Sequence, residues 1–140
     1  MENCKGIPNQ KGVYLVIFEG GARPTFVEKG SGGHYKDRDP NVPISELVAK
    51  WIEGAQIVNI GQTESSLKKR ICQYMRFGQG KSVAHHGGRY IWQIQDHKNL
   101  IVCWKAMSGE SESAKVFECQ LIQEFEKDHG GRLPFANLKG

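Results

Sequence analysis

The distribution of apolar residues predicts several short strands along the chain. Residues 12–18, GVYLVIF, combine β-branched and aromatic side chains and predict the first strand. Residues 24–29 follow a Gly20-Gly21 turn and are expected to pair with it. Further short apolar runs predict strands at residues 55–60, 89–94 and 100–105.

Helical periodicity predicts three helices among these strands. Ser45 is a candidate N-cap for a short helix, and Thr63 for a second helix that extends to about residue 77. Residues 111–129 predict the third helix, and the Gly130-Gly131 pair would stop it.

These elements together predict an α+β fold. We expect a small central antiparallel or mixed sheet of about three strands, flanked by helices, with an extra hairpin. The sequence contains no internal repeat and no linker-like segment, so residues 1–140 are expected to form a single domain.

Glu118 occupies an unusual position in the last helical segment. At about 100° per residue it lies on the same face as the apolar residues of that segment, namely Ala114, Phe117, Leu121, Ile122 and Phe125. An ionised carboxylate that faces a core is costly unless a cation, a metal or several hydrogen bonds compensate it. Glu118 is therefore either a functional residue or part of a structural ion pair with an arginine at the core edge.

Composition adds few constraints to this picture. The net charge of +4 permits a polyanionic partner without requiring one, and no apolar run is long enough to span a bilayer. The first residues lack the apolar segment of a signal peptide. We therefore expect a cytoplasmic protein without membrane contact, with four reduced cysteines, among which Cys103 and Cys119 are small core residues.

The second helix carries a basic and phenolic pair. Arg70 and Tyr74 are four residues apart, so they lie on one side of the helix, with Tyr74 in the apolar stripe and Arg70 at its edge. The planar guanidinium of arginine suits a phosphate. Lys68, Lys69 and Arg76 cover the other faces. Taken alone, the segment also fits a solvated basic helix with a tyrosine at the core edge.

The order of motifs resembles the GIY-YIG endonuclease superfamily, whose two name-giving tripeptides lie on neighbouring strands. The relevant features, in chain order, are Gly12-Val13-Tyr14, Asn59-Ile60-Gly61, the helix with Arg70 and Tyr74, Glu118, and Asn137 in a Pro-Phe-Ala-Asn tail. The Arg-x-x-x-Tyr spacing is similar to that of the nuclease domain in the bacterial excision-repair incision protein. The resemblance implies one GIY-YIG-like domain over residues 1–140, with an insertion loop at about residues 30–54.

The resemblance also implies roles for individual residues. Glu118 would hold one divalent cation, Mg²⁺ or Mn²⁺, for hydrolysis of a DNA phosphodiester. Tyr14 would orient or deprotonate the attacking water, and Arg70 would clamp the scissile phosphate. Tyr74 would assist in proton transfer or in orienting the phosphate, and Asn137 would hold the site together by hydrogen bonds. For Tyr14 and Asn137, a half-buried strand tyrosine and an ordinary turn asparagine are the alternatives.

Two positions depart from the family pattern. Asn59 stands where the family usually has tyrosine, and Gln62 stands where the excision-repair relatives often have lysine. An amide cannot accept a proton from water, so a replacement general base is required if that tyrosine is the base. His34 and Tyr35, in the insertion loop, are possible replacements.

The leading hypothesis is a metal-dependent DNA endonuclease, of a repair, restriction-like or mobile-element kind. Lys68, Lys69 and Arg76 would contact the DNA backbone, and a homodimer or a partner protein could supply specificity. The alternative is a nucleic-acid-binding module that keeps the fold but cleaves poorly. Asn59 and Gln62 favour that alternative, whereas Tyr14, Arg70, Glu118 and Asn137 favour the enzyme.

Overall fold

A computed structural model of the chain describes residues 6–19, 23–31, 41–78, 89–95, 97–109 and 112–137. It has an α+β fold, as predicted, with a three-stranded antiparallel sheet and three α-helices. In chain order the elements are β1 (Gly12–Ile17), α1 (Ile44–Lys50), β2 (Ile57–Thr63), α2 (Leu67–Gly78), the 3-10 helices Arg89–Gln93 and His97–Asn99, β3 (Ile101–Ala106) and α3 (Ala114–Asp128). None of the described helices is long and apolar enough to cross a bilayer.

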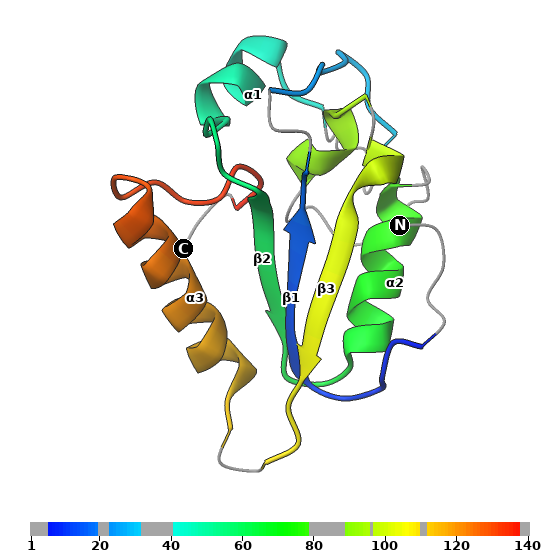
Figure 1. Ribbon diagram of the computed structural model, residues 1–140. Helices are drawn as coiled ribbons and strands as arrows, with labels where there is room; N and C mark the ends of the chain where they lie inside the picture. The colour runs from blue at the N-terminus through cyan, green and yellow to red at the C-terminus, as the bar shows by residue number, and fades with distance from the viewer. Residues whose placement is uncertain are drawn as a thin grey trace.

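The sheet has the strand order β2-β1-β3, so β1 is the central strand (Figure 1). Tyr14, in the middle of β1, lies opposite Gly61 of β2 and Trp104 of β3. The register with β2 shifts after Val16, which leaves Val58 as an extra residue in β2. Such a bulge bends a strand locally and re-aims the side chains beside it.

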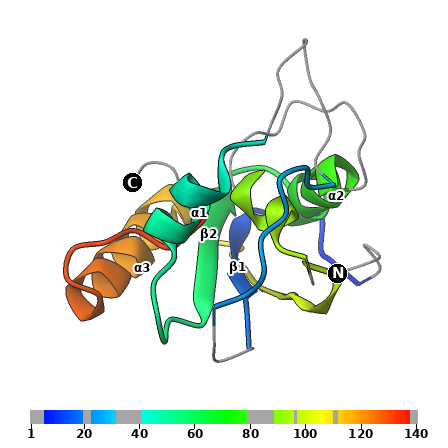
Figure 2. The ribbon, with the colours of Figure 1, turned by 90° about the horizontal axis from the view of Figure 1, so that it is seen from above.

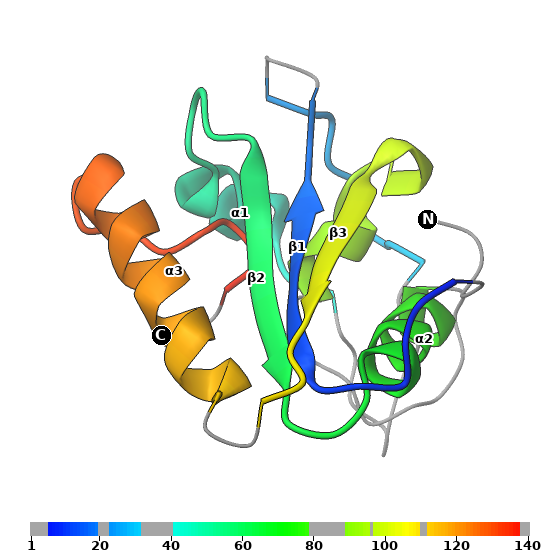
Figure 3. The ribbon, with the colours of Figure 1, turned by 60° about the horizontal axis from the view of Figure 1, so that its bottom comes forward.

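The helices α2 and α3 lie on opposite sides of the sheet (Figures 2 and 3). Side chains alternate between the two faces of a strand. Tyr14 and Val16 therefore pack on the α2 side, in a core cluster that includes Ile71. Leu15 of β1 and Ile60 of β2 face the α3 side, where Ile60 packs with Ile122 and Phe125. Because β1 is central, the outer edges of β2 and β3 have no strand partner within the described part of the chain.

The predicted extra hairpin is wrong. Residues 24–29 contribute an isolated bridge, between Phe26 and Ile94, and the predicted strand at 89–94 is mostly the 3-10 helix Arg89–Gln93. Residues 90–94 are buried without alternation, and a short apolar run of that kind fits a strand or a buried helical turn equally well. The Val27 amide donates to the Gln93 carbonyl, and the buried Gln93 side chain adds further hydrogen bonds. Its Nε2 donates to the carbonyls of Val27 and Val42, and its Oε1 accepts from the Val42 amide.

Two predicted helix caps are also wrong. The residue before α1 is Pro43, which makes no side-chain cap bond, and Ser45 lies inside the helix. Helix α2 begins at Leu67, and the Oγ of Ser66 accepts a hydrogen bond from the Lys69 amide at 3.1 Å. Thr63 is the last residue of strand β2, so it lies too far before Leu67 to cap the helix.

The cysteines differ from the expectation as well. Cys103 is exposed on β3, because α3 covers β2 and β1 but leaves the β3 edge open. Cys119 is half-buried, and both are free thiols. Cys72 is disulfide-bonded, so the expectation of reduced thiols is wrong at that position.

The cap of α2 can be tested with a matched pair of substitutions. Ser66→Ala should lower the free energy of unfolding by about 1 kcal/mol, the usual value of an N-cap bond. Thr63→Ala should cost at most about 0.5 kcal/mol, because Thr63 makes only exposed hydrogen bonds to its neighbour Ser65. Urea denaturation measures both. A larger loss for Thr63→Ala than for Ser66→Ala would contradict the assignment.

Candidate active site at the outer edge of β2

The ring of Tyr14 lies directly across Gly61. A Cβ atom added to Gly61 would be 2.2 Å from Tyr14 Cζ and 2.4 Å from its hydroxyl oxygen, closer than any real contact. Glycine is therefore required at this position if the phenol is to extend over β2. Gly12 is similarly constrained, because its Cβ would lie 2.2 Å from the Lys105 carbonyl oxygen. Close packing in the sheet thus explains why both Gly12, which begins the first tripeptide, and Gly61, which ends the second, are glycines.

Arg70 approaches Tyr14 from α2. It is half-buried, and its side chain is hydrogen-bonded to the Tyr14 phenol. It also lines an open polar hollow of about 540 Å³ between the end of β2 and the first turns of α2. Gln62 lines the same hollow, and its Oε1 is buried without a hydrogen-bond partner in the described structure. An unpaired buried acceptor of this kind is uncommon and is available to a water molecule or a ligand.

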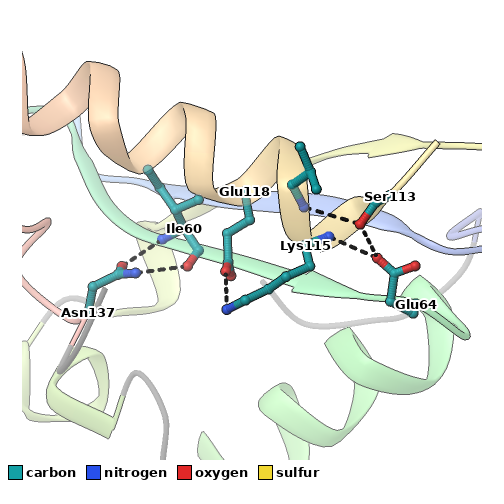
Figure 4. A network of polar contacts seen from close by, with 7 residues as sticks. Ile60, Glu64, Ser113, Lys115, Glu118 and Asn137 are labelled. Carbon is teal, nitrogen blue, oxygen red and sulfur yellow. Dashed lines mark hydrogen bonds and ion pairs between the residues drawn. The ribbon is translucent and has the colours of Figure 1, made fainter.

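Glu118 approaches from α3. Its side chain is 13% exposed, so it belongs to the inward-facing side of the helix, as the sequence predicted. Figure 4 shows its carboxylate pointing from α3 toward β2, beside Ile60. The Nζ of Lys115 lies 3.4 Å from Glu118 Oε1, and Lys115 itself is 58% exposed. Among the described residues, the cation that pairs with Glu118 is thus a lysine of the same helix and not an arginine at the core edge.

Arg70 and Glu118 both affect the ionisation of Tyr14. Burial raises the pKa of the Tyr14 phenol above its ordinary value of 10.0, the charge and hydrogen bond of Arg70 oppose that rise, and the Glu118 carboxylate adds to it. Tyr14 is therefore protonated at neutral pH. In that form it can donate a hydrogen bond to an oxygen atom or relay a proton, but it is not an ionised base.

Tyr74 and Asn59 lie behind Tyr14. Tyr74 is 2% exposed, and its ring packs edge-on against Tyr14 with 6.2 Å between the ring centres. Asn59 is buried too, and its Nδ2 donates to the Tyr74 hydroxyl at 3.2 Å. Burial raises the pKa of Tyr74 well above the ordinary value, and the nearby Tyr14 adds to that rise. Tyr74 and Asn59 therefore support Tyr14 from the core, and direct proton transfer by Tyr74 stays a prediction.

The C-terminal tail occupies the free edge of β2 (Figure 4). Asn137 Oδ1 accepts from the Ile60 amide at 2.8 Å, and its Nδ2 donates to the Ile60 carbonyl at 3.0 Å. The Ala136 amide donates to the Val58 carbonyl at 2.7 Å. These bonds satisfy backbone groups that an edge strand would otherwise leave exposed. They also hold Ile60 in place beside Glu118.

Sequence reasoning missed a further carboxylate, Glu64. Its Oε1 accepts from Ser113 Oγ at 3.3 Å and from the Lys115 amide at 2.8 Å (Figure 4). The bond from the Lys115 amide is the main reason why the pKa of Glu64 is lowered. Glu64 thereby ties the end of β2 to the start of α3, one turn before Glu118. No local pattern could reveal this contact between residues so far apart in sequence, although the Lys115–Glu118 spacing was visible.

The remaining predicted residues fall into two groups. Lys68, Lys69 and Arg76 are exposed on α2, and Lys69 lines the same hollow as Arg70. His34 and Tyr35, the possible replacement bases, lie outside the described residues.

The residues at this edge fit a hard divalent cation. The described part of the chain contains no group of three or more metal-ligating side chains. Mg²⁺ does not require one, because it is commonly held by one or two carboxylates together with waters and substrate phosphates. The Lys115 ammonium beside Glu118 shows that this carboxylate accommodates a cation. Glu118 is accordingly the candidate ligand for Mg²⁺ or Mn²⁺.

Comparison of the chain with protein-family models, curated proteins and solved structures found no match. The assignment of a function therefore depends on the geometry of the site itself.

The raised pKa values of the two buried tyrosines predict a pH dependence of stability. Because these values lie above 10.0 in the folded state, the native phenols keep their protons when those of the unfolded chain begin to ionise. The free energy of unfolding contributed by these groups should be fully present below pH 10 and decline above it. Tyr14→Phe should make the decline shallower, as measured by urea denaturation across the alkaline range. Equal slopes in the native protein and the variant would contradict the burial argument.

The contact between Tyr14 and Gly61 predicts the effect of a single methyl group. Gly61→Ala should lower the free energy of unfolding by about 1–3 kcal/mol, because the ring must move or the strands must separate. Gly109→Ala is the matched control: its Cβ would meet only the flexible side chain of Glu112, and its cost should stay within about 0.5 kcal/mol. Thermal or urea unfolding measures both variants. Equal free energies of unfolding for the two variants would show that the position of the Tyr14 ring does not require glycine at residue 61.

Proposed function

We propose that this chain is a metal-dependent DNA endonuclease of the GIY-YIG type. The observation that supports it best is that Arg70 of α2 and Glu118 of α3 both act on the pKa of Tyr14 in β1. A half-buried carboxylate, a guanidinium and a protonated phenol that influence one another suit the hydrolysis of a phosphodiester. The three-stranded antiparallel sheet with flanking helices is compatible with that family.

Each residue of the proposed site has a distinct task. Arg70 would bind the scissile phosphate with its planar fork and stabilise the negative charge that develops there. Glu118 would hold the divalent ion, which when bound supplies Lewis-acid stabilisation and a more acidic water. Tyr14 would orient the attacking water through its hydroxyl, and its burial keeps that hydroxyl protonated at neutral pH.

The surface of α2 suits the DNA backbone. Lys68, Lys69 and Arg76 are exposed on the helix that carries Arg70, and the net charge of the chain is +4. Contacts from lysine and arginine to phosphates supply affinity that does not depend on sequence. This surface would therefore place a DNA strand along the edge of β2.

One observation favours a second function, a nucleic-acid-binding module that cleaves poorly. Asn59 stands where the family usually has tyrosine, and its amide is buried and bonded to Tyr74. It therefore cannot act as a base at the site. In this alternative, Arg70 and the exposed cations of α2 bind DNA without efficient hydrolysis.

Two substitutions test the proposed enzyme. Glu118→Gln should fold normally but lose measurable binding of Mg²⁺ or Mn²⁺ in calorimetry. Arg70→Ala should slow single-turnover cleavage by roughly 10²–10³-fold, the effect of one donor aimed at transition-state charge. Its DNA affinity should fall much less, because the other cations of α2 remain.

Arg76→Ala is the control, since it should weaken DNA affinity and cleavage at low DNA concentration by the same factor. The substrates are supercoiled, branched and single-stranded DNA with each metal. Retained DNA affinity without cleavage of any of these substrates would support the binding module and exclude the enzyme.

A further inference from the structure

Lys115 connects the two carboxylates at the start of α3. Its backbone amide is held by Glu64 at 2.8 Å, whereas its ammonium lies 3.4 Å from Glu118 Oε1 (Figure 4). The side chain is 58% exposed, so it can leave Glu118 without any movement of the helix. The backbone is thus anchored while the charged end is free to change partner.

An exposed ion pair of this spacing is weak. Pairs three residues apart on a helix contribute only a few tenths of a kcal/mol, and water screens them further. A divalent cation on the same carboxylate interacts with it twice as strongly as an ammonium at equal distance, and it would also repel the ammonium. The ion and the Lys115 ammonium therefore compete for Glu118.

We propose that Lys115 is an exchangeable counter-cation at this site, which occupies Glu118 until a divalent ion displaces it and then contacts a DNA phosphate. This inference depends on the proposed function, because it assumes that Glu118 is the metal ligand. Before displacement, the lysine balances a carboxylate that would otherwise lie half-buried without a partner. After displacement, its positive charge is available to a phosphate at the start of α3, which Glu64 ties to the end of β2. The exchange couples loading of the metal to binding of the substrate.

The test measures the affinity of Mn²⁺ alone and does not depend on cleavage. Lys115→Met keeps most of the side-chain length but removes the charge, so Mn²⁺ should bind roughly two- to threefold more tightly in calorimetry. Lys115→Arg keeps the charge and should bind Mn²⁺ as the native protein does. Lys127→Met is the matched control, because Lys127 is an exposed lysine in the last turn of the same helix. Its affinity for Mn²⁺ should be unchanged.

The second half of the proposal concerns DNA. At saturating Mn²⁺, Lys115→Met should cleave DNA about tenfold more slowly in single turnover, whereas Lys127→Met should cleave at the native rate. An unchanged cleavage rate in Lys115→Met would overturn the phosphate contact.

Unchanged or weaker Mn²⁺ binding in Lys115→Met, with binding still abolished by Glu118→Gln, would overturn the exchange and leave the proposed function intact. Absence of any Mn²⁺ binding that depends on Glu118 would overturn both.

Discussion

The contact between the Tyr14 ring and the bare backbone of Gly61 determines how this site is built. With no side chain on Gly61, the phenol crosses from the central strand toward the outer edge of β2. Arg70 of α2 lowers the pKa of this phenol, and Glu118 of α3 raises it. A methyl group at Gly61 would fill the space that the ring occupies. The absence of a side chain at one position of β2 therefore decides where the Tyr14 phenol lies.

Strand β2 is connected by hydrogen bonds both to the C-terminal tail and to the start of α3. Asn137 and Ala136 bind its backbone at Ile60 and Val58, while Glu64 binds the first turn of α3. These contacts fix the distance between the tail, the strand and the helix that carries Glu118. In the proposed site, metal affinity at Glu118 and the stability of the tail should thus be coupled, because both depend on the same strand edge.

Several features could be predicted from local sequence because a local pattern determines them. The helical period placed Glu118 on the inward face of α3, and the run of β-branched residues placed β1. The residues around 90–94 could not be assigned in that way, because full burial removes the alternation that distinguishes a strand. Thr63 and Ser66 are both good N-cap residues, so the local sequence does not show which of them precedes α2. The length of β2, which extends to Thr63, decides for Ser66.

The polar contacts that complete the site depend on tertiary structure. Glu64 and Lys115 are 51 residues apart, and Ile60 and Asn137 are 77 apart, so no periodicity connects them. Asn59 illustrates the same limit: its amide takes a structural role with Tyr74 that only the packing of β2 against α2 reveals.

The central claim is that Glu118 and the edge of β2 form a metal site, and anomalous scattering from crystals soaked in Mn²⁺ tests it most directly. The account predicts one strong peak within about 2–2.5 Å of a Glu118 carboxylate oxygen, with the Lys115 ammonium moved away from that carboxylate. It also predicts that this peak is lost in Glu118→Gln crystals. A peak at another position, or no peak in native crystals with Lys115 still paired to Glu118, would contradict it.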